Sequence, residues 1–404
     1  YGDHRDLHVR SRRQRQMCIR DRDNSVQYGH WLRLFSNSMI WYNVDRYKEL
    51  GSPNFESFDE IIEFTKLNST KNKNATYIEF PRTIKKGEII SLKIWFGGYP
   101  ITAKNPPWDG GFTWSEDNNK PWVGVSCQGI GASLWWPCKD HQSDEPDSMR
   151  ITISVRSPLN AISNGRLKRD TSYWSNYMNS WMNEYEWFVS YPINNYNVTI
   201  NVAHYSGFED ILIRNDDTLD LSYYVLKKNL SIAKNHFKQV KPIITCLEKY
   251  LGSYPFERDG FTLVETPYLG MEHQSAVTYG NGFSIYNGIR SKSWPMYGVI
   301  DPLIIHETGH EWFGNSVTAS DPTHIWIHEG LQVYSEAIFF EDKFDSYEVG
   351  IHYLNTLKNR IVNKIPIVGR EHENHWALHG DCLLYTSDAA DDSLRVDLGG
   401  RRII

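Results

Sequence analysis

Hydrophobic and polar residues alternate in short runs through the first half of the chain. The runs are TYIEF (76–80), EIISLKIWF (88–96), MRITISV (149–155), EWFVSY (186–191) and NVTINVA (197–203). Gly, Pro, Asn and Asp separate them, as in NPPWDGGF and EDNNKPW. A period of two, with turn residues between the runs, is typical of half-buried strands. Residues 76–202 therefore predict an all-β domain.

From Leu221 onward the apolar residues recur with a helical period instead. The run SYYVLKKNLSIAKNHFKQVKPIITCLEKYLG, residues 222–252, predicts the first long helix, which Gly252 and Pro255 would end. FTLVETP, residues 261–267, predicts a short strand after it. The second half of the chain is therefore expected to be mainly helical.

The change of pattern places a domain boundary between Phe208 and Leu219. The body of the chain, from about Asp23 to Asp381, is longer than one hydrophobic core usually holds, so two domains are expected. We predict a multidomain α+β fold, in which an all-β domain over residues 23–207 precedes a mainly helical domain over residues 208–381.

The two ends of the chain differ from everything between them. Residues 1–22 are basic and lack apolar periodicity, and residues 382–404 form a tail that starts CLLYTS. If MCIRDR is back-translated, the complementary strand can be read as CLLYTS, and RRQRQ is related to SDAAD in the same way. We therefore interpret both ends as adaptor-derived, non-native segments. The native chain is expected to run from about Asp23 to Asp381.

Charge and cysteine content exclude several classes of protein. The whole chain has a net charge of −6 and its ends are on balance basic, so the body is more acidic still, which argues against nucleic-acid binding. Cys127, Cys138 and Cys246 predict no disulfide framework, although one bridge between the first two stays open. No apolar run is long enough to span a membrane, but an upstream segment could carry a signal or an anchor, so the compartment stays open.

The candidate chemistry concentrates in one stretch, DPLIIHETGHEWFGNSVTASDPTHIWIHEGLQVYSE, which starts at Asp301. Asp301 is a good N-cap and Pro302 suits the first helical position, so a helix is predicted to begin here. Two histidines four residues apart, His306 and His310, then face the same side of the helix. Gly309 costs such a helix up to about 1 kcal/mol relative to Ala, which predicts that another group packs close to its backbone.

The pattern H-E-x-x-H on a helix is typical of a catalytic zinc site. His306 and His310 can hold one Zn²⁺, and Glu307 then points beside the metal, where it can take a proton from water. Glu329 lies on a second helix predicted to begin near Ile325, and it would be the third ligand of an open site of the thermolysin type. The alternative is that the pattern is accidental and that these are ordinary polar residues of an amphipathic helix.

Two further glutamates have both a functional and a structural interpretation. Glu336 lies two turns beyond Glu329 on the same helix face, where it is either a solvated carboxylate or the acceptor of a ligand histidine's free N–H. Glu272, in LGMEHQSAVTYG at residues 269–280, follows Gly270, where the backbone can approach a ligand closely. Taken alone, Glu272 is better explained as a loop glutamate in solvent.

Together these motifs resemble the zinc aminopeptidase N family, which also includes the leukotriene hydrolase/aminopeptidase. The family's zinc motif, H-E-x-x-H with eighteen residues to a Glu, matches the four residues of the predicted zinc site. The run Gly270, Met271 and Glu272 is similar to its exopeptidase motif, G-x-M-E-N, although Gly and Met are adjacent here and His273 stands in place of the usual Asn. In CQGIGASLWWPCKD, Gln128 falls at the position whose side chain helps to hold the substrate amino terminus. The resemblance covers most of residues 76–381.

The resemblance implies a saddle-like β domain followed by a thermolysin-like zinc-peptidase domain that is truncated at its C-terminal end. It implies one Zn²⁺ per chain and peptide substrates with a free N-terminus, whose α-ammonium group Glu272 and Gln128 would bind. The family also has a downstream tyrosine that donates a hydrogen bond to the oxyanion, but Tyr385 belongs to the adaptor-like tail and is not assigned this role. The predicted function is a zinc aminopeptidase. A thermolysin-type zinc endopeptidase and an inactive zinc-binding fragment are the alternatives, and the oligomeric state is not readable.

Overall fold

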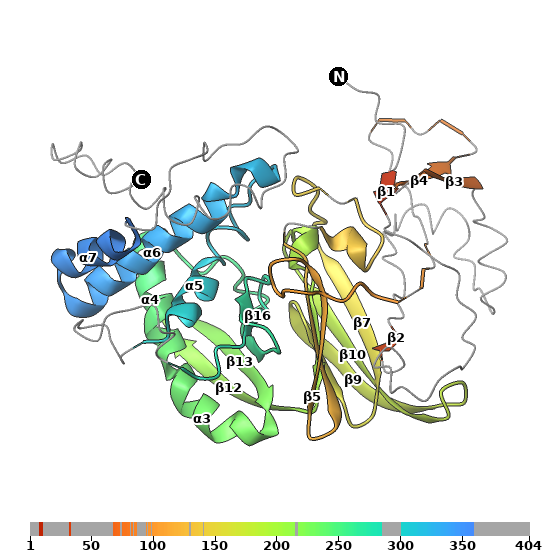
Figure 1. Ribbon diagram of the computed structural model, residues 1–404, viewed down its shortest axis with the longest axis horizontal. Coiled ribbons are helices and arrows are strands. Elements are labelled where there is room, and N and C mark those ends of the chain that lie inside the picture. The colour runs from red at the N-terminus through yellow and green to blue at the C-terminus, as the bar shows by residue number, and fades with distance from the viewer. Residues whose placement is uncertain are drawn as a thin grey trace.

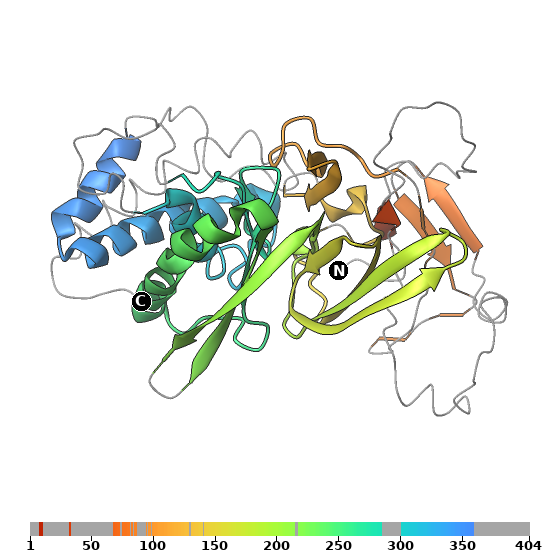
Figure 2. The same cartoon turned by 90° about the horizontal axis from the view of Figure 1, so that it is seen from below.

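The computed structural model describes residues 101–358, apart from gaps at 129–130, 140, 215–216 and 285–299, together with shorter stretches between residues 8 and 100. Apart from His8–Arg10, the two ends interpreted as adaptor-derived lie outside the described residues, as do Tyr385 and most of the predicted strand 88–96. A β-rich half and a half with long helices lie side by side (Figure 1, Figure 2). This order of a β-rich region before a helical region agrees with the predicted fold class.

The β-rich half consists mainly of two antiparallel sheets. Its strands are β2 (Leu32–Arg33), β5 (Gly111–Asp117), β6 (Lys120–Ser126), β7 (Met149–Arg156), β8 (Asn160–Ser163), β9 (Arg166–Ser175), β10 (Ser180–Val189) and β11 (Ile200–Ala203). One sheet has the order β2-β7-β10-β9 and the other the order β5-β6-β11-β8. A separate sheet joins β1 (His8–Arg10), β4 (Ala75–Glu79) and β3 (Asn68–Asn72).

Local sequence accounts for much of this half. The strand predicted over 149–155 is confirmed as β7, whose side chains at Ile153 and Val155 are buried in the core between the two sheets. The predicted turn EDNNKPW joins β5 to β6. Its two central residues, Asn118 and Asn119, have φ values of 49° and 58°, the backbone that tight hairpins need and that Asn tolerates. The predicted strand 197–203 is shorter than expected, because a 3-10 turn at Asn195–Asn197 precedes β11.

The second half begins with a five-stranded mixed sheet. Its strands are β12 (Tyr205–Ile213), β13 (Thr218–Leu226), β14 (Phe261–Glu265), β15 (Gly270–Met271) and β16 (Val277–Tyr279). They lie in the order β12-β13-β14-β16-β15, in which β13, β14 and β16 run parallel. The short strand predicted over 261–267 is therefore confirmed as β14.

The long helix predicted over residues 222–252 is wrong at its start. Residues 222–226 belong to β13, and the helical part consists of α3 (Leu230–His236), a 3-10 turn and α4 (Val240–Leu251). In β13, Leu219, Leu221 and Tyr223 point into the core while the residues between them are more exposed, which is a period of two. Pairing with β12 and β14 therefore overrides the helical reading. Gly252 does end α4, with φ of 95°.

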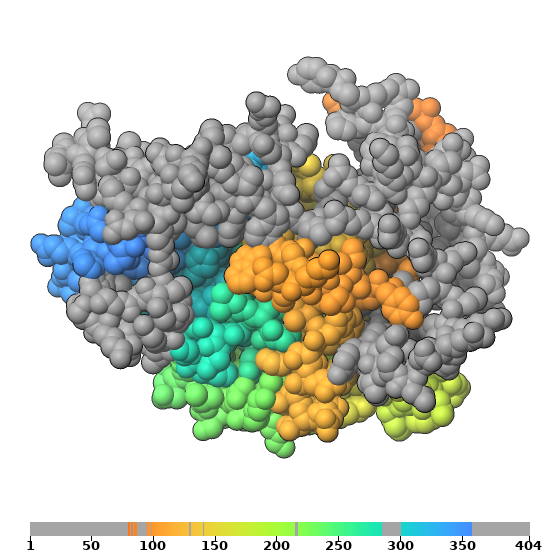
Figure 3. Space-filling view, in the orientation of Figure 1, coloured from red at the N-terminus to blue at the C-terminus, as the bar shows by residue number. Residues whose placement is uncertain are grey.

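In the described part of this half, α4 is followed by the helices α5 (Pro302–Gly309), α6 (Trp326–Phe344) and α7 (Tyr347–Lys358). They pack with α4 against the sheet around one core, in which Ile304, Ile305 and Phe340 are fully buried. Among the helices of the described part, none is long and apolar enough to cross a membrane. Figure 3 shows the orange segment of the β-rich half lying directly against the teal segment of the second half. Tyr268 makes one such contact, donating a hydrogen bond to Val125 O at 3.2 Å.

Candidate zinc and peptide site

The helix α5 begins where the sequence predicts. The Asp301 carboxylate accepts a hydrogen bond from Leu303 N at 3.0 Å, and Pro302 occupies the first turn. Asp301 is itself fully buried and also contacts His236 Nε2 at 2.9 Å and the Tyr279 hydroxyl at 2.7 Å. The predicted N-cap is confirmed, and these extra contacts fix the start of the helix to α3 and to β16.

The close contact predicted at Gly309 is also confirmed. The side chain of Gln332, on α6, lies where a Cβ atom of residue 309 would be. Gln332 Nε2 donates a hydrogen bond to Ile305 O at 3.1 Å, so α6 is joined to α5 through the gap that the glycine leaves. Glu329 lies one turn before Gln332 on α6, and this contact therefore sets it opposite the two histidines of α5.

The structure brings His306, His310 and Glu329 together. The two Nε2 atoms are 3.2 Å apart, and Glu329 Oε2 lies 3.5 Å from His306 Nε2 and 3.7 Å from His310 Nε2. Tetrahedral zinc with bonds of about 2.0 to 2.1 Å puts its ligand atoms about 3.3 Å apart. The three side chains therefore fit one zinc ion, and two imidazoles with one carboxylate are a donor set that zinc accepts.

The outer nitrogens of both histidines are held by acceptors. His306 Nδ1 lies 2.8 Å from Glu336 Oε1, and His310 Nδ1 lies 2.9 Å from Phe313 O. Since a carbonyl and a carboxylate accept hydrogen bonds, Nδ1 carries a proton in each ring, and the two Nε2 atoms are left as the nitrogens that could bind a metal. Glu336 is buried and not a solvated carboxylate, and the hydroxyl of Tyr353 donates to its other oxygen.

Electrostatics at this place favour a cation. Burial lowers the pKa of His310 to about 3, which keeps the imidazole neutral. Burial acts in the same direction on His306, but the carboxylates of Glu329 and Glu336 outweigh it and raise its pKa well above the usual value. Burial, opposed in part by His306, likewise raises the pKa of Glu307 well above the usual range. Positive charge placed between several buried carboxylates stabilises their charged forms.

Glu272 lies in this cluster and not in solvent, contrary to its interpretation as an ordinary loop glutamate. It is 97% buried, and a carboxylate oxygen of Glu272 lies within 4.8 Å of ligand atoms of Glu307 and His310. Burial and the charge of Glu329 raise the pKa of Glu272 to about 7. Gln128, from the β-rich half, donates a hydrogen bond to Glu272 Oε1 and another, at 3.2 Å, to Glu329 Oε1.

Gly270 and Met271 form β15 and place Glu272 at its end. A Cβ atom on residue 270 would lie 2.8 Å from Glu307 Oε1, so the glycine makes room for the carboxylate of Glu307. Met271 is buried in the core of the β-rich half. Next to Glu272, His273 is fully buried, and within the described residues neither ring nitrogen has a hydrogen-bond partner. Burial lowers its pKa to about 3.

The sequence reasoning missed the groups that hold this loop. Asn315, five residues beyond His310, donates a hydrogen bond to Glu272 O at 2.9 Å. Glu311 accepts Ser275 N at 2.8 Å and the Tyr254 hydroxyl at 3.1 Å, and burial raises its pKa to about 8. The one signal in the sequence that could have identified Asn315 and Glu311 as residues of the site is that they follow the H-E-x-x-H motif closely.

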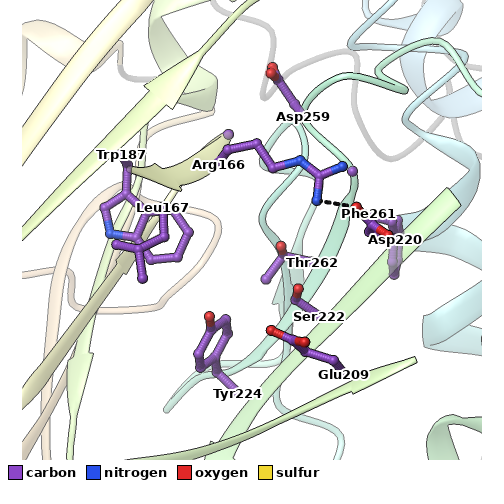
Figure 4. Close-up of a pocket in the computed structure, with 12 residues that line it drawn as sticks. Arg166, Leu167, Trp187, Glu209, Asp220, Ser222, Tyr224, Asp259, Phe261 and Thr262 are labelled. Atoms are coloured by element: carbon purple, nitrogen blue, oxygen red, sulfur yellow. Dashed lines mark ion pairs between the residues drawn. The ribbon is translucent and has the colours of Figure 1, made fainter. Parts of the chain in front are cut away.

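A crevice of about 250 Å³ opens elsewhere, between β9 and β10 on one side and β12 to β14 on the other. Figure 4 shows Arg166 reaching across it to Asp220, with which it forms an ion pair at 2.7 Å. Trp187 and Tyr224 also line it. None of the residues predicted for the site lines this crevice, so it is separate from the predicted zinc ligands.

Comparison with known proteins identifies related sequences. Residues 236–374 match the peptidase family M1 domain. Leucine aminopeptidase 2 of Aspergillus terreus is 24% identical over 357 residues, which cover 78% of this chain and 52% of the relative. Aminopeptidase N of Bos taurus is 25% identical over 215 residues, which cover 52% of this chain and 21% of that protein. The chain therefore spans about half the length of the Aspergillus relative.

Solved structures share the fold. The M1 zinc metallopeptidase of Deinococcus radiodurans superposes with a TM-score of 0.65 at 17% identity, over 83% of this chain and 71% of that chain. A mutant of that enzyme bound to a Tyr-Ser-Ala substrate gives a TM-score of 0.61 at 15% identity, over 80% and 68% of the two chains.

Proposed function

Because this chain belongs to the M1 peptidase family, we propose that it acts as a zinc-dependent aminopeptidase that removes the N-terminal residue from peptides. The observation that carries the proposal is the position of Glu272. A ligand atom of its buried carboxylate lies within 4.8 Å of ligand atoms of His310 and Glu307. An anion at this place is needed to bind a free α-ammonium group, and an enzyme that cleaves inside a peptide has no use for it.

His306, His310 and Glu329 would hold one zinc ion per chain. Zinc, when bound, supplies a Lewis acid that makes water nucleophilic near neutral pH and polarises the scissile carbonyl. The hydrogen bonds from the two Nδ1 atoms to Glu336 and Phe313 O orient the imidazoles for this purpose.

Glu307 is the general base in this mechanism. It takes the proton of the attacking water and passes it to the leaving amine. The burial that raises the pKa of this carboxylate suits a group that must accept a proton and release it again in one turnover. Gly270 leaves space for it beside the strand that carries Glu272.

Glu272 and Gln128 would hold the amino terminus of the substrate. An ammonium group paired with Glu272 places the first peptide bond over the metal ligands and beside Glu307. A mutant of the Deinococcus neighbour is bound to a Tyr-Ser-Ala substrate, and this supports a peptide as the class of substrate.

The test compares substrates that differ only at the amino group. The zinc-loaded protein should hydrolyse leucine 4-nitroanilide and leave N-acetyl-leucine 4-nitroanilide intact. Glu272→Ala should raise KM and lower kcat, with a loss in kcat/KM on the order of 100-fold or more. Glu209→Ala, which removes an exposed glutamate of β12, is the matched control and should change neither. Equal cleavage of the acetylated and free substrates, or of acetylated peptides at internal bonds, would instead favour the endopeptidase alternative.

A further inference from the structure

The hydroxyl of one tyrosine reaches the Glu272 carboxylate from the other half of the molecule. Tyr196 lies in the 3-10 turn Asn195–Asn197, between β10 and β11. Its Oη lies 3.2 Å from Glu272 Oε1 and 3.3 Å from His328 Nδ1, and its side chain is 96% buried. The Tyr196 and His328 rings are also stacked, with centroids 6.1 Å apart and planes inclined by 22°. Neither residue belongs to the motifs that define the proposed zinc and ammonium sites.

The backbone determines the direction of these hydrogen bonds. His328 Nε2 lies 2.9 Å from Ala319 N and accepts its proton, so this nitrogen carries none of its own. A neutral imidazole whose Nε2 is an acceptor has its proton on Nδ1, and His328 Nδ1 therefore donates to the Tyr196 oxygen. Tyr196 is then left with one proton, which it donates to Glu272 Oε1.

We propose that Tyr196, oriented by His328, is a positioning residue that sets the Glu272 carboxylate for the α-ammonium group of the substrate. This inference rests on the proposed aminopeptidase function and adds a residue to its recognition of the amino terminus. Tyr196 and Gln128 both donate to Oε1, so within the described residues the two hydrogen bonds from other side chains to this carboxylate go to that oxygen. The other oxygen, Oε2, is thereby left for the incoming ammonium group.

Positioning matters here because a glutamate side chain has three rotatable bonds. Without donors on Oε1, the carboxylate loses the contacts that keep it in one orientation before substrate arrives. Tyr196 also connects the two halves, since it comes from the β-rich half while Glu272 and His328 come from the second half. His328 directly precedes Glu329, so the same contact links the ammonium site to the helix that carries the third predicted zinc ligand.

The experiment measures binding of two hydroxamates to the zinc-loaded protein by calorimetry. Leucine hydroxamate carries a free ammonium group, and 4-methylpentanohydroxamate is the same molecule without it. Tyr196→Phe removes only the hydroxyl, and a hydrogen bond to a charged group corresponds to about 10- to 100-fold in affinity. We therefore expect Tyr196→Phe to weaken binding of leucine hydroxamate by about 10-fold or more, with binding of 4-methylpentanohydroxamate unchanged. In turnover of leucine 4-nitroanilide the loss should fall mainly on KM.

A matched control is Tyr205→Phe, because Tyr205 is a buried tyrosine whose hydroxyl donates to Glu265 O at 2.8 Å, away from the cluster. It should leave the ratio of the two hydroxamate affinities unchanged. His328→Gln, whose amide cannot reproduce the Nδ1–H, should shift this ratio in the same direction as Tyr196→Phe. A Tyr196→Phe protein that keeps the wild-type ratio overturns the inference, and so does an equal loss for both ligands, which would indicate a general structural defect.

Failure of the proposed function gives a different result. If the wild-type protein binds the two hydroxamates equally, it has no ammonium site, and the assignment of Glu272 fails together with the role of Tyr196. If the wild type prefers leucine hydroxamate and Glu272→Ala abolishes this preference while Tyr196→Phe does not, only the role of Tyr196 is refuted.

Discussion

Gly309→Ala tests how the helix with the zinc motif is packed. A Cβ atom at this position would lie 2.5 Å from Gln332 Cδ, whereas carbon atoms in good contact are about 3.5 to 4.0 Å apart. Gln332 is fully buried, its Nε2 donates to Ile305 O at 3.1 Å, and its Oε1 accepts from Ser335 Oγ at 2.6 Å. The amide therefore cannot move aside without losing both hydrogen bonds.

The magnitude follows from these contacts. A buried amide group left without its partner costs about 1 to 3 kcal/mol, and forcing extra volume into a packed contact costs a similar amount. The better helix propensity of Ala returns only about 1 kcal/mol. We expect Gly309→Ala to lower the free energy of unfolding by about 2 to 4 kcal/mol. Separation of α5 from α6 would also move Glu329 away from the two histidines and weaken zinc binding.

The assay is urea denaturation followed by circular dichroism, with zinc content measured after dialysis. Gln332→Ala removes the overlapping side chain, so the double variant Gly309→Ala/Gln332→Ala should be more stable than the sum of the two single effects predicts. A Gly309→Ala protein as stable as the wild type, with full zinc content, would refute this account of the contact between α5 and α6.

Three further predictions concern single groups of the site. Glu336→Gln should weaken zinc binding by about 10- to 100-fold, because Glu336 accepts the Nδ1–H of His306. Competition with a chromophoric chelator measures the zinc affinity, and an unchanged affinity would exclude a role of Glu336 in orienting His306. Glu307→Ala should keep zinc and lose hydrolysis of leucine 4-nitroanilide, so retained turnover would rule it out as the base. Asp301→Ala should lower the free energy of unfolding by about 1 to 2 kcal/mol through the lost helix cap alone. The loss should be larger in total, because Tyr279 and His236 also lose a hydrogen-bond partner. Thermal denaturation that shows no loss of stability would contradict the capping role.

Contacts within one element could be predicted because their geometry is local. The N-cap at Asp301 depends on residues two positions apart, and the common face of His306 and His310 follows from 3.6 residues per turn. The sequence predicted that some group packs close to the backbone at Gly309, but not which residue it is. A glycine inside a helix indicates that something approaches, while the identity of Gln332 depends on how α6 crosses α5.

The secondary structure predicted from residue propensity was wrong where pairing with distant strands determined the fold. Residues 222–226 combine aromatic and aliphatic residues that fit a helix or a strand, and only the partners β12 and β14 make them part of β13. The burial of Glu336 could not be predicted from the sequence either. Its position two turns from Glu329 places it on the correct helix face, but the packing of α7, which supplies Tyr353, removes it from solvent.

The sequence by itself determined the zinc motif, the helix that presents it and the chemistry of its donors, since these depend on residue type and short spacing. The tertiary structure alone decided which distant groups surround that motif. Gln128 and Tyr196 come from the β-rich half, and each meets Glu272 across a sequence separation that no local rule spans. The physical reason is that helical periodicity fixes neighbours within a few turns, whereas the burial of two cores against each other selects the contacts between halves.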